Sequence, residues 1–365
     1  MNRPSLAPAG PAHRDLHDAL RTIAAGATDR DQAREPAFPH EAFETLNGAG
    51  LLSWNAVAGA QRPPANEELG LVRKVAAADG SVGRIFDGHL SAVERLAVQG
   101  PEDLRDRELA VIAAGELLCG VWGGDPGPGE GPPARVVTGS GGAALRGVKT
   151  FCSGAGGLDR ALVLARHEPD RPPVAVWVDL TDREGVSIDR SWYRAAGLRA
   201  SESHRVVFHD ARVLAQFGAP GALGEQPWFA RDALRTAASW VGMADSALQG
   251  ALDELATRPG VSELEGLAVG RMQAAHRTIE LWHSAGAQAM DTGECLPATA
   301  VHARVAIVDA VRVLLDEASR ICGSRPFAIG GKLDRARRDL ELFLLQHRLD
   351  PILARAGLAE LEQRR

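Results

Sequence analysis

A histidine near the C-terminal end of the chain lies where an imidazole could act as a base. His347 follows Leu344, Phe343 and Leu340 by three, four and seven residues, which places it on the apolar stripe of an expected helix. A neutral imidazole can accept a proton at pH 7. A histidine on such a stripe is more often a hydrogen-bonded core residue, so the residues alone leave both interpretations open.

Other groups of reactive residues carry less signal. His13 and His17 are four residues apart but have no third ligand nearby, so the sequence predicts no metal site. His204 and His209 are five residues apart on an expected strand and should point to opposite faces. The chain has no GxSxG, P-loop or HExxH motif, which argues against the hydrolase, nucleotide and metalloprotease chemistries that those motifs support.

Three stretches of different periodicity must position these groups. Residues 15–118 carry apolar side chains at helical spacing, and a loop follows at 123–133, where nine of eleven residues are Gly or Pro. Residues 135–213 show short β-branched segments between turns, with a hairpin turn expected at 138–142. From Trp228 onward, four apolar stripes predict long helices.

The expected fold class is therefore α+β and multidomain. We expect an N-terminal all-α domain at 1–118, a middle β-barrel or β-sandwich domain at 119–225, and a C-terminal four-helix bundle at 226–365. A chain of 365 residues is long enough for two or three such packing units.

Composition narrows the class of protein and its partners. The 41 Lys and Arg residues against 47 Asp and Glu residues give a net charge of -6, which provides no general attraction to nucleic acid or to anionic membranes. The four cysteines are far apart, which favours a reducing compartment over a disulfide framework. With no run of 18 apolar residues, we expect a cytoplasmic protein that does not span a membrane.

The order of the segments, helical, then β, then helical, resembles the acyl-CoA dehydrogenase superfamily, and three local sequences support this resemblance. Residues 145–155, LRGVKTFCSGA, are similar to the strand that meets the flavin ring in that family. Residues 197–213, GLRASESHRVVFHDARV, resemble the turn and strand before the C-terminal domain, and residues 333–339, LDRARRD, resemble the family's R-x-x-R-D helix start. The resemblance covers nearly the whole chain and implies a flavin bound between the domains.

The resemblance also assigns residues to the cofactor, with FAD expected and FMN as the alternative. The isoalloxazine contacts implied in this way are the main chain of Val121, Trp122 and Gly123 together with Phe151, Cys152 and Ser153. The diphosphate and adenine contacts, which a neighbouring subunit often completes in this family, fall on Arg258, Arg271, Arg320, Gly323 and Ser324. Arginine suits this task because its planar guanidinium pairs with phosphate oxygens. The resemblance thus implies a homodimer or homotetramer.

The position of the catalytic base departs from the family pattern. Dehydrogenases of this family carry a Glu eight residues after the Asp of R-x-x-R-D, and the count from Asp339 gives His347 here. The family's other base position falls on Asp232. Residues 78–90, ADGSVGRIFDGHL, look like the helix that supplies an active-site His in the dibenzothiophene monooxygenase branch, which makes His89, Ser153 and His347 the matching set for that branch.

Three functions follow from the resemblance. The first is a flavin-dependent dehydrogenase that oxidises an acyl-CoA-like or other small organic substrate, with His347 as base and an electron-transfer flavoprotein as partner. The second is a monooxygenase that uses reduced flavin and oxygen and is served by a flavin reductase. The third is a non-catalytic member of the family that keeps the scaffold for binding or assembly.

Overall fold

The structure is a computed structural model, and it describes residues 13–56, 62–139, 142–182, 184–346 and 348–365. Helices come first along the chain. They are α1 (His13–Ala25), α2 (Ala27–Gln32), α3 (His40–Gly48), α4 (Ala65–Ala78), α5 (Gly80–Gln99) and α6 (Glu102–Ala113). The longest of these first six, α5, is almost completely buried. The predicted helical start of the chain is confirmed.

A single residue joins the two central helices of this segment. Asp79 ends α4 and caps α5, because its carboxylate accepts the main-chain N–H groups of Ser81 (2.8 Å) and Val82 (3.1 Å). Arg30 of α2 pairs with the other carboxylate oxygen of Asp79. This short connection holds the adjoining ends of α4 and α5 close together.

The strands form one strongly curved sheet. They are β1 (Cys119–Trp122), β2 (Arg135–Gly139), β3 (Gly142–Cys152), β4 (Arg160–Ala165), β5 (Val174–Asp179), β6 (Val186–Asp189) and β7 (His204–Phe217). The strand order is β1-β4-β5-β7-β3-β2, and β6 also pairs with β7. Isolated bridging between Arg135 and Arg166 brings the β2 edge back to the end of β4, so the sheet closes in the manner of a barrel.

The predicted hairpin between residues 135 and 149 is confirmed. Strands β2 and β3 pair antiparallel from Arg135 opposite Arg146 to Gly139 opposite Gly142. The turn residues 140 and 141 lie outside the described residues. Strand β7 then extends the sheet, because its first part pairs with β3 and β6 and its last part pairs with β5.

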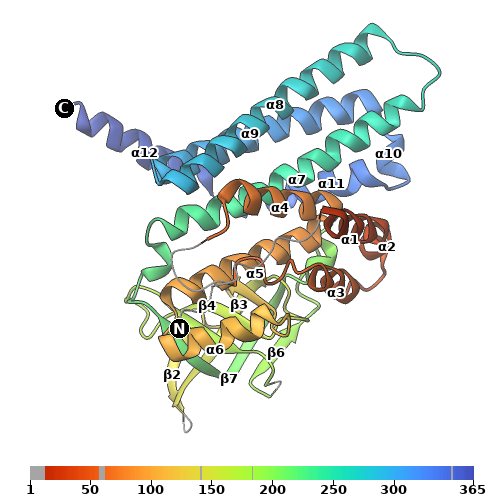
Figure 1. Ribbon diagram of the computed structural model, residues 1–365. Helices are drawn as coiled ribbons and strands as arrows, with labels where there is room; N and C mark the ends of the chain where they lie inside the picture. The colour runs from red at the N-terminus through yellow and green to blue at the C-terminus, as the bar shows by residue number, and fades with distance from the viewer. Residues whose placement is uncertain (1–12, 57–61, 140–141, 183, 347) are drawn as a thin grey trace, which may run out of the picture.

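Long helices form the C-terminal part of the molecule. They are α7 (Trp228–Ala256), α8 (Glu263–Thr292), α9 (Leu296–Cys322), the short α10 (Arg325–Ala328), α11 (Lys332–Phe343) and α12 (Leu349–Gln363), with the 3-10 turns η1 (Arg199–Ser201) and η2 (Ala222–Gly224) before them. Helix α8 begins with a capping box between Ser262 and Glu265. Helix α12 projects from the end of the bundle (Figure 1), and Leu353, Leu358 and Leu361 on it are exposed.

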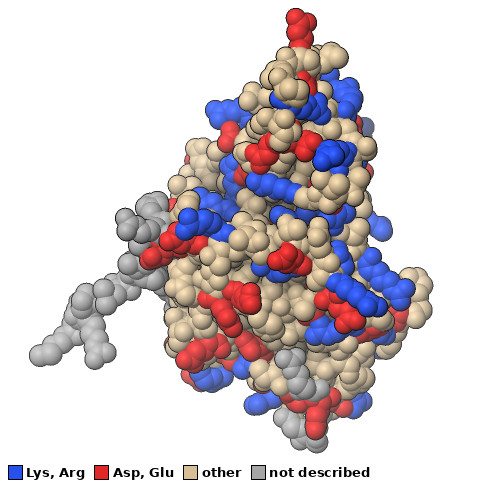
Figure 2. Space-filling view, turned by 90° about the vertical axis from the view of Figure 1, so that its right-hand side faces the viewer, with Lys and Arg blue, Asp and Glu red and all other residues tan. Residues whose placement is uncertain are grey.

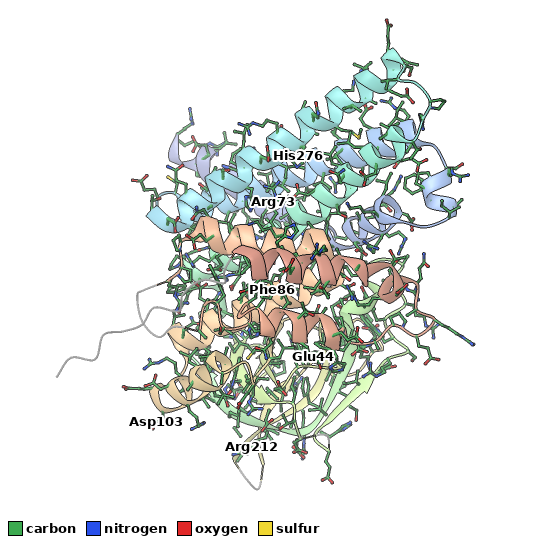
Figure 3. The ribbon with its side chains drawn as sticks, turned by 45° about the vertical axis from the view of Figure 1, so that its right-hand side comes forward. Glu44, Arg73, Phe86, Asp103, Arg212 and His276 are labelled. Atoms are coloured by element: carbon green, nitrogen blue, oxygen red, sulfur yellow. The ribbon has the colours of Figure 1, made fainter. Side chains whose placement is uncertain are left out.

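Helices α4 and α5 lie between the sheet and the C-terminal bundle (Figure 1). Figure 3 shows Phe86 of α5 inside this middle layer, and its side chain is completely buried. Arg73 of α4 and His276 of α8 both bond Asp245 of α7, at 2.5 Å and 2.7 Å (Figure 3). These polar bonds attach α4 to the C-terminal bundle.

The surface carries both signs of charge. On the face shown in Figure 2, acidic and basic side chains are interspersed. Among the helices that the structure describes, none combines the length and the apolar character needed to cross a bilayer. All four cysteines have free thiols, as their wide spacing in the sequence predicts.

Candidate functional site

A cavity of ≈ 590 Å³, here called the larger chamber, opens where the sheet, α5 and the end of α11 meet. Its lining comes from segments that are far apart in the chain. The described residues that line it are Arg84, Val121, Gly123, Gly124, Phe151, Ser153, Tyr193, Leu198, Ser203, Leu342, Phe343, Leu345 and Gln346. Most of this wall is apolar, and none of these residues is an Asp or a Glu.

Strand β1 contributes one wall through its alternating side chains. Val121 and Gly123 line the larger chamber, whereas the side chain of Trp122 points into the core and donates its indole N–H to the carbonyl of Ser153 (3.0 Å). A Cβ on Gly123 would meet no other atom within 4 Å, so the main chain here borders open space. Of the three residues expected here, Val121 and Gly123 line the larger chamber, and Trp122 does not.

The end of β3 supplies the second group of expected residues. Phe151 has a φ of 53°, which is a costly conformation for an aromatic residue, and its ring meets Trp192 edge to face at 4.8 Å. Phe151 and Ser153 line the larger chamber. The Cys152 thiol is fully buried in the core, and this burial raises its pKa.

Three serine hydroxyls form a hydrogen-bonded row beside the larger chamber. The hydroxyls of Ser153 and Ser203 are 2.9 Å apart, and those of Ser203 and Ser201 are 2.8 Å apart. Tyr193 lines the same chamber and donates its phenol to the carbonyl of Gly197 (3.0 Å). Burial raises the pKa of this phenol, so it stays protonated. The chamber thus offers several neutral hydroxyl groups.

A second cavity of ≈ 240 Å³, here called the smaller chamber, adjoins the larger one. The two chambers share Arg84, Val121, Gly123 and Gln346. The further described residues of the smaller chamber are Asp87, Gly88, Ser91, Leu223, Phe229, Asp232, Ala233, Thr236 and Arg304. Unlike the larger chamber, the smaller one has charged groups of both signs in its wall.

Both carboxylates of the smaller chamber are already paired. Asp87 accepts from the Arg84 guanidinium (2.6 Å) and from the Ser239 hydroxyl (2.9 Å). Asp232 accepts from Arg95 (2.6 Å) through one oxygen and from Arg235 (3.0 Å) through the other. Burial raises the pKa of both carboxyl groups, and the neighbouring guanidiniums oppose this rise.

A buried ionic network supports this wall from behind. Arg235, which is completely buried, pairs with Glu68 of α4 and with Glu94 of α5 (2.6 Å) as well as with Asp232. Arg231 adds a second bond to Glu94 (2.8 Å). These charges compensate one another where water is absent, so removing one of them would leave the others unpaired. The network holds α4, α5 and α7 in register around the chamber.

His89 takes a different place from the one expected in the monooxygenase branch. Its Nε2 bonds the carbonyl of Leu52 at 2.7 Å, and its Nδ1 accepts the main-chain N–H of Cys119 at 3.1 Å. The ring is completely buried and lines neither chamber, and burial lowers its pKa to about 4. In this structure the ring is a neutral packing residue, because both nitrogens are engaged by main chain.

The remaining catalytic candidates differ in what the structure describes. Asp232 lines the smaller chamber and not the larger one. His347 lies outside the described residues. Its neighbour Gln346 lines both chambers.

The residues expected at the cofactor phosphates make contacts within the chain. Arg258 pairs with Glu265 and donates to the carbonyls of Ile321 (2.9 Å) and Cys322 (3.3 Å). Arg271 and Arg320 both pair with Glu317. Gly323, with a φ of 73°, ends α9, and Ser324 precedes α10. These five residues line neither chamber of this chain.

Several lining residues escaped sequence reasoning. Tyr193 is the only tyrosine in the chain, and this rarity could have marked it as a candidate site residue. Arg304 lies between Val301 and Val308 on an apolar stripe. A charged residue on the apolar face of a helix could likewise have marked it as a candidate site residue. Ser203 and Arg84 carry no such signal, because serine and arginine are common in loops and on helix surfaces.

Known proteins with a similar sequence match about half of the chain. No protein-family model matches the chain. A dibenzothiophene monooxygenase of Rhodococcus qingshengii is 31% identical over 214 residues, which is 54% of this chain and 49% of that protein. One from Mycolicibacterium goodii is 30% identical over 209 residues, with the same coverage. The chain therefore spans about half the length of the curated relatives it matches.

Solved structures match over nearly the whole chain. FMN-bound TdsC from Paenibacillus sp. A11-2 has a TM-score of 0.81 at 21% identity and covers 96% of this chain and 98% of its own. KijD3 in complex with FMN and a dTDP-linked sugar has a TM-score of 0.81 at 21% identity, covering 97% and 95%. A probable acyl CoA dehydrogenase from Mycobacterium abscessus has a TM-score of 0.74 at 19% identity, covering 90% and 94%. The chain therefore belongs with the proteins of the acyl-CoA dehydrogenase fold.

Proposed function

We propose that this protein is a flavin-dependent monooxygenase that uses reduced FMN and oxygen to oxidise a small organic molecule. The observation that carries the proposal is the lining of the larger chamber. It holds the hydroxyls of Ser153, Ser203 and Tyr193 but, among the described residues, no carboxylate. The serine hydroxyls can donate hydrogen bonds to a partly reduced oxygen species, while the Tyr193 phenol already donates to Gly197. A dehydrogenase of this family instead needs a base for a substrate proton.

The residues of the larger chamber fit a flavin. Val121, Leu198 and Phe343 provide apolar walls for a flat ring, and the open space beside Gly123 leaves its main chain accessible to the ring edge. Arg84 is the only cationic side chain among the described lining residues, and it is already paired with Asp87. The preference for FMN over FAD therefore comes from the solved structures. The relatives TdsC and KijD3 were both solved with FMN.

In this proposal each group near the larger chamber has a separate task. Reduced FMN would supply two electrons, so that one atom of O₂ enters the substrate and the other leaves as water. The Ser153 hydroxyl, held by Ser203, would donate a hydrogen bond to the reacting oxygen. The buried apolar side chains Leu198 and Phe343 would keep water away from the reacting oxygen, which limits its loss as hydrogen peroxide.

The test measures the fate of oxygen. The protein is loaded with FMN, reduced under anaerobic conditions, and mixed with ¹⁸O₂ and a probe, either dibenzothiophene or indole. The sequence relatives are dibenzothiophene monooxygenases, and TdsC was solved with FMN and indole. We expect one ¹⁸O atom in the product. Anaerobic bleaching of oxidised FMN by the probe, without oxygen incorporation, would instead support a dehydrogenase.

A serine variant tests the role of the hydroxyl row. Ser153→Ala should lower product formed per FMN reoxidised by about tenfold or more, with hydrogen peroxide made in its place, while FMN affinity changes little. Ser246→Ala is the control, because Ser246 is a buried serine of α7 that lines neither chamber. Equal coupling in both variants would remove Ser153 from the reaction.

A dehydrogenase remains the second candidate, with His347 or Asp232 as base. Asp232 lines the smaller chamber, where a substrate proton could approach it. Burial raises the pKa of this carboxyl group, but Arg95 and Arg235 bond its two oxygens, so one of these bonds must break before Asp232 can accept a substrate proton. The variants His347→Ala and Asp232→Ala distinguish these two possible bases. If only His347→Ala loses anaerobic reduction of the flavin by the substrate, His347 is the base.

The partners follow from the same proposal. A monooxygenase of this kind needs a flavin reductase to supply reduced FMN, whereas a dehydrogenase would need an electron-transfer flavoprotein. We also propose a homo-oligomer, supported by the exposed leucines on the projecting helix α12. Light scattering on the full chain and on a variant with Leu353, Leu358 and Leu361 changed to Ser tests this, and unchanged mass in the variant would assign those leucines another role.

A further inference from the structure

One buried arginine in the smaller chamber has no counter-charge among the residues that the structure describes. Arg304 of α9 is only 4% exposed, and its Nε and Nη2 have no hydrogen-bond partner in the part of the chain that the structure describes. Its guanidinium carbon lies 5.2 Å from the centre of the Trp240 ring, so an aromatic face covers one side. Loss of water around the group lowers its pKa to about 10, and no described carboxylate opposes that effect.

The other buried arginines of this region behave differently. Arg235, Arg231 and Arg95 each contact at least one carboxylate. The two carboxylates in the chamber wall are held by other guanidiniums, so neither serves Arg304. A buried, unpaired charge is costly, and proteins rarely keep one without a partner that arrives from outside.

The surroundings of Arg304 describe the ligand. Leu223, Phe229 and Ala233 give the smaller chamber an apolar wall, and Thr236 adds a hydroxyl. A cavity of ≈ 240 Å³ accommodates an aromatic or short aliphatic body but not a long chain. The chamber borders the larger one through Val121 and Gly123, so a ligand in it would face the proposed flavin site.

We propose that the smaller chamber is the substrate subsite, and that Arg304 binds the carboxylate, sulfinate or sulfonate group of a small organic acid. That the bound acid is a substrate rests on the proposed function. That the chamber binds an organic acid does not depend on the proposed function. Arg304 is here a specificity-determining residue, because it selects acids over their neutral analogues. The acid group would sit on the guanidinium, with the apolar body directed toward the shared wall.

The experiment compares charged and neutral probes by calorimetry. Benzoate, benzenesulfonate and the neutral benzamide are titrated into the full chain at constant ionic strength, first without flavin and then with FMN bound. We expect the wild-type protein to bind the acids at least tenfold more tightly than benzamide. In Arg304→Met this preference should vanish, because methionine keeps the apolar stem and removes the charge. Inorganic phosphate is included, and equal displacement by phosphate would overturn the assignment to an organic acid.

A matched variant and a stability measurement separate binding from folding. Arg312→Met removes the same charge from an exposed position on the same helix and should leave acid binding unchanged. Without ligand, Arg304→Met should melt at the same temperature as wild type or higher, since it removes an unpaired buried charge. A lower melting temperature with an unchanged preference for acids would make Arg304 a structural residue.

The remaining outcomes also decide the question. Failure of the wild-type protein to prefer either acid over benzamide, including failure to bind any of the three, overturns the inference. A tenfold loss of FMN affinity in Arg304→Met would assign Arg304 to the cofactor phosphate instead. A wild-type chain that binds no flavin would refute the proposed function, while the comparison of acids with benzamide would still decide the anion site.

Discussion

Substituting Gly83 with Ala tests how closely the two central helices pack. A Cβ at Gly83 of α5 would lie 2.5 Å from both the Cα and the Cβ of Ala76 in α4, whereas ordinary contact begins near 3.4 Å. The helices would have to separate by about 1 Å. Asp79 alone joins them, and Ala76 is 1% exposed, so there is little room for this movement.

The expected loss of stability follows from two opposing effects. Overpacking of this kind costs about 3 kcal/mol, at the upper end of the usual range because main-chain atoms collide. The better helix propensity of Ala returns about 1 kcal/mol. The net loss is about 2 kcal/mol, which lowers the melting temperature by roughly 2–3 °C for a chain of 365 residues. Urea unfolding followed by circular dichroism gives the free energy of unfolding directly.

A control with the opposite sign is available in α8. Gly270 is exposed within this helix, and a Cβ there would meet no other atom within 4 Å. Gly270→Ala should therefore stabilise the protein by about 0.5–1 kcal/mol. If Gly83→Ala is as stable as wild type while Gly270→Ala gains stability, the close contact between α4 and α5 does not exist. Gly83→Ala should also weaken acid binding, because Arg84 follows directly and lines both chambers.

Three further predictions concern Asp339, His89 and Arg258. Burial raises the pKa of the Asp339 carboxyl group to about 7. Between about pH 4 and pH 7 the folded protein therefore keeps a proton on Asp339 that the unfolded chain releases. The contribution of the protonated Asp339 to the free energy of unfolding is complete below about pH 4 and is lost as the pH rises through 7. Asp339→Asn should therefore gain stability relative to wild type at pH 8 and much less at pH 5, measured by thermal unfolding at both values. His89→Ala should lose about 3 kcal/mol, because it leaves the carbonyl of Leu52 and the N–H of Cys119 unpaired, yet FMN affinity should stay within about twofold; loss of FMN binding without loss of stability would contradict the packing role. Arg258→Ala should cost about 1–2 kcal/mol through its lost bonds at the end of α9, and a tenfold drop in FMN affinity would instead show that the residue serves a cofactor.

The order of helical and strand segments could be predicted from local patterns. Apolar spacing indicated the helices before residue 118 and after residue 228, and Gly and Pro marked the loop at 123–133. The hairpin around 138–142 was also predictable, because strand pairing across a short turn depends on neighbouring residues. The resemblance carried the prediction further, since it brought Val121, Gly123, Phe151 and Ser153 to one place, and all four line the larger chamber.

Side-chain direction and charge pairing were decided only by the tertiary structure. His89 looked like an active-site donor, but Leu52 and Cys119, both more than 25 positions away in the chain, engage its two nitrogens. Arg304 could have been a solvated cation, and only the packing of α9 against Trp240 buries it beside a chamber. Periodicity reports which face of an element is apolar, whereas the partner of a buried polar atom depends on contacts between distant segments, which no local pattern records.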